Sequence, residues 1–131
     1  MYCVSGYRSY ATQNAIYQAK LKAAGLEYTS KYVAYPGQSE HQTGLAMDVT
    51  NEAGVQKPLT QDFGQSKEGK WLQANAHVYG FIIRYPAGKE GITGYNYEPW
   101  HIRYVGPDVA KIIQAQDLTL EEYLLEKENL L

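Results

Sequence analysis

The sequence predicts a single α+β domain in which helices flank a small antiparallel sheet. Segments with strand and helix patterns follow one another without the strict alternation that builds a parallel sheet. The 131 residues are enough for one core and too few for two domains of ordinary size. Apolar residues make up 44% of the chain and charged residues 20%, a composition that excludes a disordered or low-complexity protein.

The chain begins with a short predicted strand and a long predicted helix. Residues 2–5 form the strand, which Gly6 ends. Ser9 is the candidate N-cap of a helix that runs to about Ala24, and Gly25 supplies its stop. Along this helix we expect one apolar stripe, made of Ala11, Ala15, Ile16, Ala19 and Ala23.

A polar loop is predicted over residues 30–45, where Pro36 and Gly44 are among the turn-forming residues. The loop is longer than a simple connection needs to be, and long ordered loops tend to carry function. The apolar segment 45–50 then predicts a short strand.

The second half of the chain predicts three helices and two strands. They are, in order, a helix over 67–79, a strand over 81–85, a strand over 100–105, a helix over 107–114 and a helix over 119–130. We expect the first of these helices to bury Trp71, Leu72 and Val78 and to end at Gly80. Thr119 is the candidate N-cap of the last helix, which carries acidic residues in its first turn.

Charge and hydropathy exclude several classes of partner. Twelve basic and fourteen acidic residues give a net charge of -2, so the charge balance favours neither nucleic acid nor an anionic membrane. No apolar run approaches the roughly 18 residues that span a bilayer. Thirteen tyrosines suit a solvated cleft, since each combines an apolar ring with a hydroxyl group. We therefore expect a small molecule or a peptide as the partner.

Two of the three histidines lie in informative motifs. His41 lies in the polar loop, and Asp48 follows in the next strand. A His-x6-Asp spacing lets both side chains reach one metal ion if the loop folds back over the start of the strand, a bend that Gly44 makes feasible. In the second motif, E-P-W-H, the proline interrupts strand pairing so that Glu98 can lean toward the site that His101 enters.

The two motifs together have the composition of a catalytic metal site. His41, Asp48 and His101 offer three ligands, the number that a catalytic zinc ion takes while it keeps one position for water. Glu98 would then act as the base, and hydrolysis of an amide is the natural reaction. Each residue alone would more often be structural, but four in two dense motifs favour a site. We therefore expect one zinc ion per chain, in the cleft of the domain.

A third motif, S-G-Y-R-S-Y, joins the first strand to the first helix. Gly6 permits a sharp bend there, and Arg8 lies at a helix N-terminus that suits an anion. Arg8 could therefore stabilise a developing oxyanion. Without the other two motifs, an arginine in this place would more often pair with a surface carboxylate.

Three segments of the chain resemble one family of peptidases. They are S-G-Y-R-S-Y-x-x-Q, S-E-H-Q-T-G-L-A-M-D and G-F-I-I-R-Y-P-x-G-K-E-x-I-T-G-Y-x-Y-E-P-W-H-I-R-Y-V-G. These motifs resemble the zinc D-alanyl-D-alanine carboxypeptidases of the VanY type, a group that includes related L,D-carboxypeptidases and D,D-dipeptidases. The resemblance extends from about Val4 to about Tyr123, which is nearly the whole chain.

The resemblance implies a role for each candidate residue. The implied zinc ligands are His41, Asp48 and His101. Glu98 would be the general base and then the acid, and Arg8 would bind the scissile carbonyl and its oxyanion. Ser39 and Gln13 match positions that help to hold the terminal residue of the peptide in such enzymes. Trp100 lies where it could form a wall of the small D-alanine pocket.

The resemblance also implies a substrate and a location. We expect a zinc carboxypeptidase that removes the terminal D-alanine from a peptidoglycan stem peptide or its precursor, and the cell envelope, outside the cytoplasmic membrane, as its location. Members of the family usually carry a further N-terminal helix and often a signal or membrane anchor, which we expect this chain to lack. A monomer is the default expectation for the oligomeric state.

Several alternatives remain open at this point. An L,D-carboxypeptidase acting on tetrapeptide stems, or a dipeptidase acting on free D-alanyl-D-alanine, would differ only in the pocket walls, for which residues 51–66 and 86–97 are the candidates. An endopeptidase would need an open-ended groove. A wall-binding module that keeps zinc without turnover is disfavoured by Glu98 and Arg8, since neither is needed to hold the metal.

Overall fold

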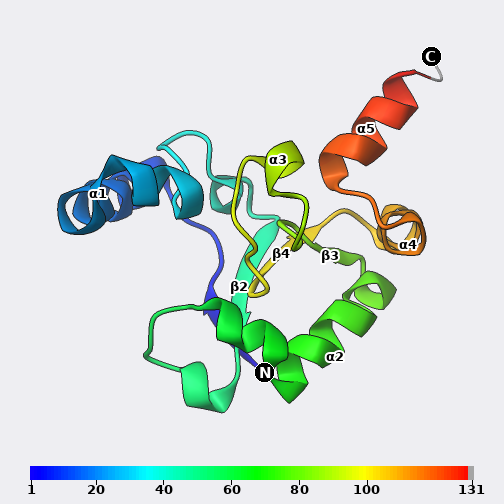
Figure 1. The fold of residues 1–131 in the computed structure, drawn as a ribbon, viewed down its shortest axis with the longest axis horizontal. Helices are drawn as coiled ribbons and strands as arrows, with labels where there is room; N and C mark the ends of the chain where they lie inside the picture. Colours follow the sequence, from blue (N-terminus) through cyan, green and yellow to red (C-terminus); the bar gives the residue numbers. More distant parts are fainter. Residues whose placement is uncertain (130–131) are drawn as a thin grey trace.

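The computed structural model describes residues 1–129 and contains a four-stranded antiparallel sheet with helices around it (Figure 1). The strands are β1 (Tyr2–Ser5), β2 (Ala46–Thr50), β3 (Phe81–Ile83) and β4 (His101–Tyr104). Their order across the sheet is β1-β2-β4-β3, and every neighbouring pair is antiparallel. The predicted α+β fold is therefore confirmed.

The helices lie on different sides of this sheet. They are α1 (Tyr10–Tyr32), α2 (Lys67–Asn75), α3 (Glu90–Thr93), α4 (Pro107–Gln116) and α5 (Leu120–Glu128). In Figure 1, α1 lies at the left and α4 and α5 at the right, with β2, β4 and β3 between them. None of the helices within residues 1–129 is long and apolar enough to cross a bilayer.

Helix α1 begins where the sequence predicts and continues beyond the predicted end. The Ser9 hydroxyl accepts a hydrogen bond from the backbone N–H of Thr12, which confirms the N-cap. Gly25 has a left-handed φ of 78° and breaks the helix, but a second helical segment then runs to Tyr32. The non-helical backbone of Gly25 produces the kink, and the Thr29 hydroxyl donates to the carbonyl oxygen of Gly25 in the first turn of the second segment.

The apolar stripe expected along α1 is not the face that this helix buries. All five of its members are exposed, and the residues that the helix buries are Gln13, Tyr17 and Thr29. Helix α1 lies beside the sheet instead of over it. Its side chains, among them Gln13, Ile16 and Ala19, line the pocket described below, and none of them belongs to the main core described within residues 1–129.

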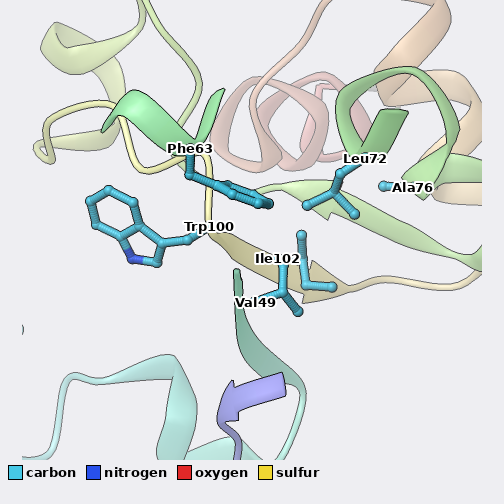
Figure 2. Packing of buried hydrophobic residues seen from close by; sticks show 6 residues of the cluster. All are labelled: Val49, Phe63, Leu72, Ala76, Trp100 and Ile102. Carbon is cyan, nitrogen blue, oxygen red and sulfur yellow. The ribbon is translucent and has the colours of Figure 1, made fainter. Parts of the chain in front are cut away.

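The two faces of the sheet serve different purposes, because successive side chains of a strand point to opposite faces. On one face Val49 of β2 and Ile102 of β4 pack against Phe63 and Leu72 to form the main core. Figure 2 shows this cluster, with the indole of Trp100 at one side of the ring of Phe63. The opposite face carries polar side chains from the middle of β2 and β4.

Helix α2 and the turn after it bury fewer residues than predicted. Leu72 and Ala76, four positions apart, face the core, whereas Trp71 is 47% exposed and Val78 is 54% exposed. The helix ends at Asn75, and a 3₁₀ turn continues to Tyr79. This tighter turn changes the angular spacing of the side chains, so Val78 points to solvent.

Gly80 ends this turn as predicted, and no other residue fits its place. Its φ is 82°, and a Cβ atom added there would lie 2.7 Å from a ring carbon of Tyr104. The left-handed conformation and the close approach both require a residue without a side chain. The strand after it is shorter than predicted and ends at Ile83.

The C-terminal helices close the β3 edge of the sheet. Ile82 packs with Ala110 and Ile113 of α4 in a second core cluster. Thr119 caps α5 in a capping box with Glu122, as the sequence predicts. Helix α5 extends to Glu128, and the predicted end at Leu130 lies outside the described residues.

Candidate metal centre and active site

The register of the sheet brings Asp48 and His101 together. The two residues are directly paired across β2 and β4, on the face opposite the main core. His101 Nδ1 lies 2.9 Å from Asp48 Oδ1, and both residues are buried. Burial alone would raise the pKa of Asp48, but the neighbouring imidazole rings of His101 and His41 lower that pKa to about 2, so the carboxylate is ionised at neutral pH.

His41 reaches the same carboxylate from the polar loop. It lies in a 3₁₀ turn, Glu40–Thr43, which Ser39 caps by accepting a hydrogen bond from the His41 N–H at 3.3 Å. Gly44 ends the turn with a left-handed φ of 75°, and the chain folds back into β2. His41 Nε2 then lies 3.2 Å from Asp48 Oδ1. The bend expected at Gly44 is present.

The three side chains fit a divalent metal ion. One ligand atom from each of His41, Asp48 and His101 lies within 4.8 Å of the others. His41 Nδ1 lies 2.7 Å from the carbonyl oxygen of Gly6, which only accepts, so Nδ1 carries the proton and Nε2 offers a lone pair. That Nε2 atom is buried and has no hydrogen-bond partner within residues 1–129. Two imidazole nitrogens and one carboxylate suit zinc, and three ligands are the catalytic number.

Glu98 lies beside this cluster with a perturbed pKa. Its side chain is buried, and its backbone is fixed by hydrogen bonds to Tyr85 and His101. Burial raises the pKa of Glu98 to about 8, with a further contribution from the negative charge of Asp48, while His101 and Arg8 act in the opposite direction. A carboxyl group with a pKa near neutrality can both accept and donate a proton during a reaction.

Arg8 lies on the other side of the cluster, held in place by Gln13. Arg8 Nη1 donates to Gln13 Oε1 at 3.1 Å, and Nη2 lies 3.5 Å from Asp48 Oδ2. Gln13 Nε2 in turn donates to the backbone carbonyl of Ala34 at 2.9 Å. Burial lowers the pKa of Arg8, and the negative charges of Asp48 and Glu98 oppose this shift. Gln13 therefore orients Arg8, a contact that the sequence did not indicate.

One pocket joins these groups. It has a volume of about 710 Å³. All eight candidate residues line it, namely Arg8, Gln13, Ser39, His41, Asp48, Glu98, Trp100 and His101. Both predicted wall segments contribute to it, the first through residues 58–61 and the second through Tyr95. The structure therefore brings the three sequence motifs to one place, and the individual role of each residue stays a prediction.

Sequence analysis did not single out Tyr85 and Glu40, two residues of this pocket that contact His101. The ring of Tyr85 stacks on the ring of His101, with centroids 5.2 Å apart and planes 12° from parallel. Glu40 Oε2 lies 3.3 Å from His101 Nε2. Burial would raise the pKa of Glu40, but the hydrogen bond from His101 and the charge of Arg84 lower it to about 2. Only the position of Glu40 directly before His41 could have drawn attention to it.

Comparison with known proteins gives one family. The family model described as VanY, D-alanyl-D-alanine carboxypeptidase, matches residues 1–107. The chain is 56% identical over 120 residues to the putative carboxypeptidase YodJ of Bacillus subtilis (strain 168), a match that covers 92% of this chain and 44% of YodJ. It is 46% identical over 125 residues to VanXYC of Enterococcus gallinarum, which is named a bifunctional D-Ala-D-Ala dipeptidase and D-Ala-D-Ala carboxypeptidase. This match covers 92% of this chain and 64% of VanXYC. The chain spans about half the length of the curated relatives it matches.

Solved structures agree with this result. The LdcB LD-carboxypeptidase superposes with a TM-score of 0.82 and 55% identity, over 93% of this chain and 56% of LdcB. A mutant of the vancomycin resistance D,D-pentapeptidase VanY, in complex with Zn(II), superposes with a TM-score of 0.78 and 40% identity, over 94% of this chain and 70% of that one. The chain therefore belongs to the VanY family of carboxypeptidases and dipeptidases, and it carries the expected α+β fold.

Proposed function

We propose that this domain is a zinc carboxypeptidase that removes the terminal D-alanine from a peptidoglycan stem peptide. The observation that carries the proposal is the meeting of a three-ligand metal cluster, a carboxyl group with raised pKa and a partly buried arginine in one pocket. The Zn(II) complex of a VanY relative supports the choice of metal. His41, Asp48 and His101 would hold one ion per chain.

The residues around the ligands have complementary tasks. A zinc ion at these ligands would supply a Lewis acid that polarises the scissile carbonyl and acidifies water. Glu98 accepts the proton of the attacking water and passes it to the leaving amino group of D-alanine. Arg8 donates hydrogen bonds to the carbonyl oxygen as negative charge develops there, and Gln13 holds its guanidinium in place.

The residue before the scissile bond and the length of the peptide together distinguish three possible activities. The sequence prediction is a D,D-carboxypeptidase acting on pentapeptide stems, and the description of the family model supports it. An L,D-carboxypeptidase acting on tetrapeptide stems is the second candidate, because identity with LdcB is 55% and with the VanY structure only 40%. A D-Ala-D-Ala dipeptidase is a third, supported by the name of VanXYC.

The proposed substrate also sets the proposed partner and location. Stem peptides are assembled into the wall outside the cytoplasmic membrane, so we propose the cell envelope as the place of action for the carboxypeptidase. The dipeptidase alternative has no such requirement. The partner is a peptide in each case, and a monomer stays the expectation.

Mass spectrometry of defined peptides tests this proposal. The zinc-loaded domain is incubated with a pentapeptide stem, a tetrapeptide stem, free D-alanyl-D-alanine and a stem with a blocked carboxyl terminus, each with and without chelator. Loss of one alanine from the pentapeptide alone, abolished by chelation, supports D,D-carboxypeptidase activity. Cleavage of the tetrapeptide or the dipeptide selects the corresponding alternative, and cleavage of the blocked stem selects an endopeptidase.

A pair of variants separates an enzyme from a binding module. Glu98→Gln keeps the volume of the side chain and removes the proton acceptor, so kcat/KM should fall by about 100-fold or more while zinc stays bound. Glu90→Gln changes an exposed acid of α3 that does not line the pocket and should leave activity unchanged. Zinc-loaded wild-type protein that binds stem peptides and cleaves none of them would contradict the enzymatic proposal.

A further inference from the structure

The partly buried carboxylate of Glu40 lies between His101 and two arginines. Glu40 Oε2 lies 3.3 Å from His101 Nε2, and Glu40 Oε1 accepts hydrogen bonds from Arg84 Nε at 2.6 Å and Arg103 Nη1 at 2.8 Å. The side chain of Glu40 is only 12% exposed and that of Arg84 only 11%. One oxygen of Glu40 thus accepts hydrogen bonds from the two arginines, and the other faces the imidazole ring of His101.

The same arginine connects this carboxylate to the C-terminal helix. Arg84 Nη1 and Nη2 donate to the two carboxylate oxygens of Glu121 at 2.9 Å and 2.6 Å, in the first turn of α5. All three nitrogens of the Arg84 guanidinium are therefore engaged, one by Glu40 and two by Glu121. Such a bidentate pair fixes the orientation of the guanidinium as well as its position.

We propose that Glu40 is a positioning residue for His101, and that Glu121 of α5 keeps Glu40 in place through Arg84. His101 Nδ1 faces Asp48 and is the ring nitrogen on the side of the metal cluster, so Nε2 must carry the proton when Nδ1 binds metal. A carboxylate can only accept at Nε2, and it therefore selects that tautomer and fixes the ring plane. This inference rests on the proposed metal-binding role of His101 and on none of the peptide specificities.

The two arginines explain why Glu40 acts on the ring and is no ligand itself. They hold Oε1 on the side away from His101, so only Oε2 reaches the imidazole. Within residues 1–129, Glu40 does not belong to the metal-binding cluster. The ring of Tyr85 covers one face of the His101 imidazole and restricts its rotation further.

The contribution of α5 extends the metal centre beyond the part that the family model covers. That match ends at residue 107, whereas Glu121 belongs to α5. A second ion pair, between Lys89 and Glu122 at 3.2 Å, also ties α5 to the body of the domain, but it does not involve Arg84 or Glu40. Breaking this pair therefore serves as a matched control, because it weakens the attachment of α5 without changing Arg84 or Glu40.

Zinc affinity and the visible spectrum of the Co²⁺-loaded protein test the proposal. Glu40→Gln keeps the side-chain volume, but its amide cannot accept from both the arginines and the His101 ring. We expect zinc affinity, measured by competition with a chromophoric chelator, to fall by about 10- to 100-fold, with a changed Co²⁺ absorption band. Glu121→Gln should lower the affinity by about three- to tenfold. Lys89→Gln should change neither measurement.

Urea unfolding of the metal-free variants shows whether each one is folded, and so separates positioning from general destabilisation. If folded Glu40→Gln binds zinc as tightly as wild type with the same Co²⁺ spectrum, the positioning role is wrong. If only Glu121→Gln behaves like wild type, or if Lys89→Gln weakens zinc equally, the coupling to α5 is wrong. A wild-type protein that binds no zinc overturns the inference, whereas one that binds zinc and cleaves no peptide overturns the proposed function alone.

Discussion

The acidic residues of the pocket differ in protonation because their neighbours differ. Asp48 is buried and Glu40 is partly buried, yet their hydrogen-bonding and charged neighbours lower both pKa values to about 2. Glu98 is also buried, and burial dominates there, so its pKa rises to about 8. Adjacent acids whose pKa values differ in this way are typical of catalytic sites. In such sites the ionised acids stabilise charge, and the acid with the raised pKa transfers protons.

Zinc binding should release a proton from His101. Burial alone would lower the pKa of this histidine, but hydrogen bonds to Asp48 and Glu40 raise it to about 9 in the metal-free protein. The ring is therefore protonated on both nitrogens at pH 7, and a metal ion at Nδ1 must displace one proton. Glu98, with its pKa of about 8, can release a second proton, so we expect at least one proton per zinc at pH 7 and close to none above pH 10, and zinc affinity should rise with pH up to about 9.

Calorimetric titration of zinc in buffers of different ionisation enthalpy measures this release. The slope of the observed enthalpy against the buffer enthalpy gives the number of protons. A slope near zero at pH 7 would mean that His101 is already neutral before the metal binds.

Replacing Arg8 by lysine should reduce catalysis and spare the metal site. Lysine keeps the positive charge near Asp48 but lacks the planar fork that Gln13 orients. Loss of an oriented donor to a developing oxyanion costs about 100- to 1000-fold in kcat. Steady-state kinetics with chelator competition should therefore show a large fall in kcat and little change in zinc affinity. An equal loss of zinc affinity would assign Arg8 to the support of Asp48 instead.

Elements with a local signal were predictable, and the faces they bury were not. The hydroxyls of Ser9 and Thr119 and the conformational freedom of Gly25 and Gly80 act within a few residues, so the sequence shows them directly. Which side of a helix is covered depends on distant segments. The alanine face of α1 is exposed because nothing within residues 1–129 packs over it.

Helix α2 gives a direct test of which of its faces is buried. Leu72→Ala removes a side chain that is 4% exposed from the main core and should lower the free energy of unfolding by about 2–5 kcal/mol. Trp71→Ala, on the exposed side next to Tyr79, should cost less than about 1 kcal/mol. Urea unfolding of both variants makes the comparison, and a larger cost for Trp71→Ala would reverse the assignment of the faces.

At the scale of the molecule, the site draws on most of the chain. The motifs around Arg8, His41 and His101 were visible in the sequence because each is short and dense. Their convergence depends on the pairing of β2 with β4, where His101 meets Asp48 from 53 positions away, and on the return of the polar loop. The link from Glu40 to Glu121 depends on the same long-range packing, and no local pattern marks it.

Because ligands from separate segments meet in one place, metal should stabilise the whole fold. At free zinc 100 times above Kd, binding adds about 2.7 kcal/mol and should raise Tm by roughly 10 °C. Mg²⁺ should have little effect, since it prefers six oxygen ligands. Thermal unfolding with zinc, with zinc and chelator, and with Mg²⁺ measures this. The absence of a zinc-dependent shift would contradict a preformed site.

The alternation along β2 and β4 makes correct folding a condition for chemistry. Asp48 and His101 lie on one face of the sheet, and their neighbours Val49 and Ile102 lie on the other. A strand that slipped by one residue would turn its metal ligand into the core and its core residue into the pocket. A misregistered chain would therefore lose its packing and its metal together. In this architecture a copy with the wrong strand register would lack the proposed metal site altogether.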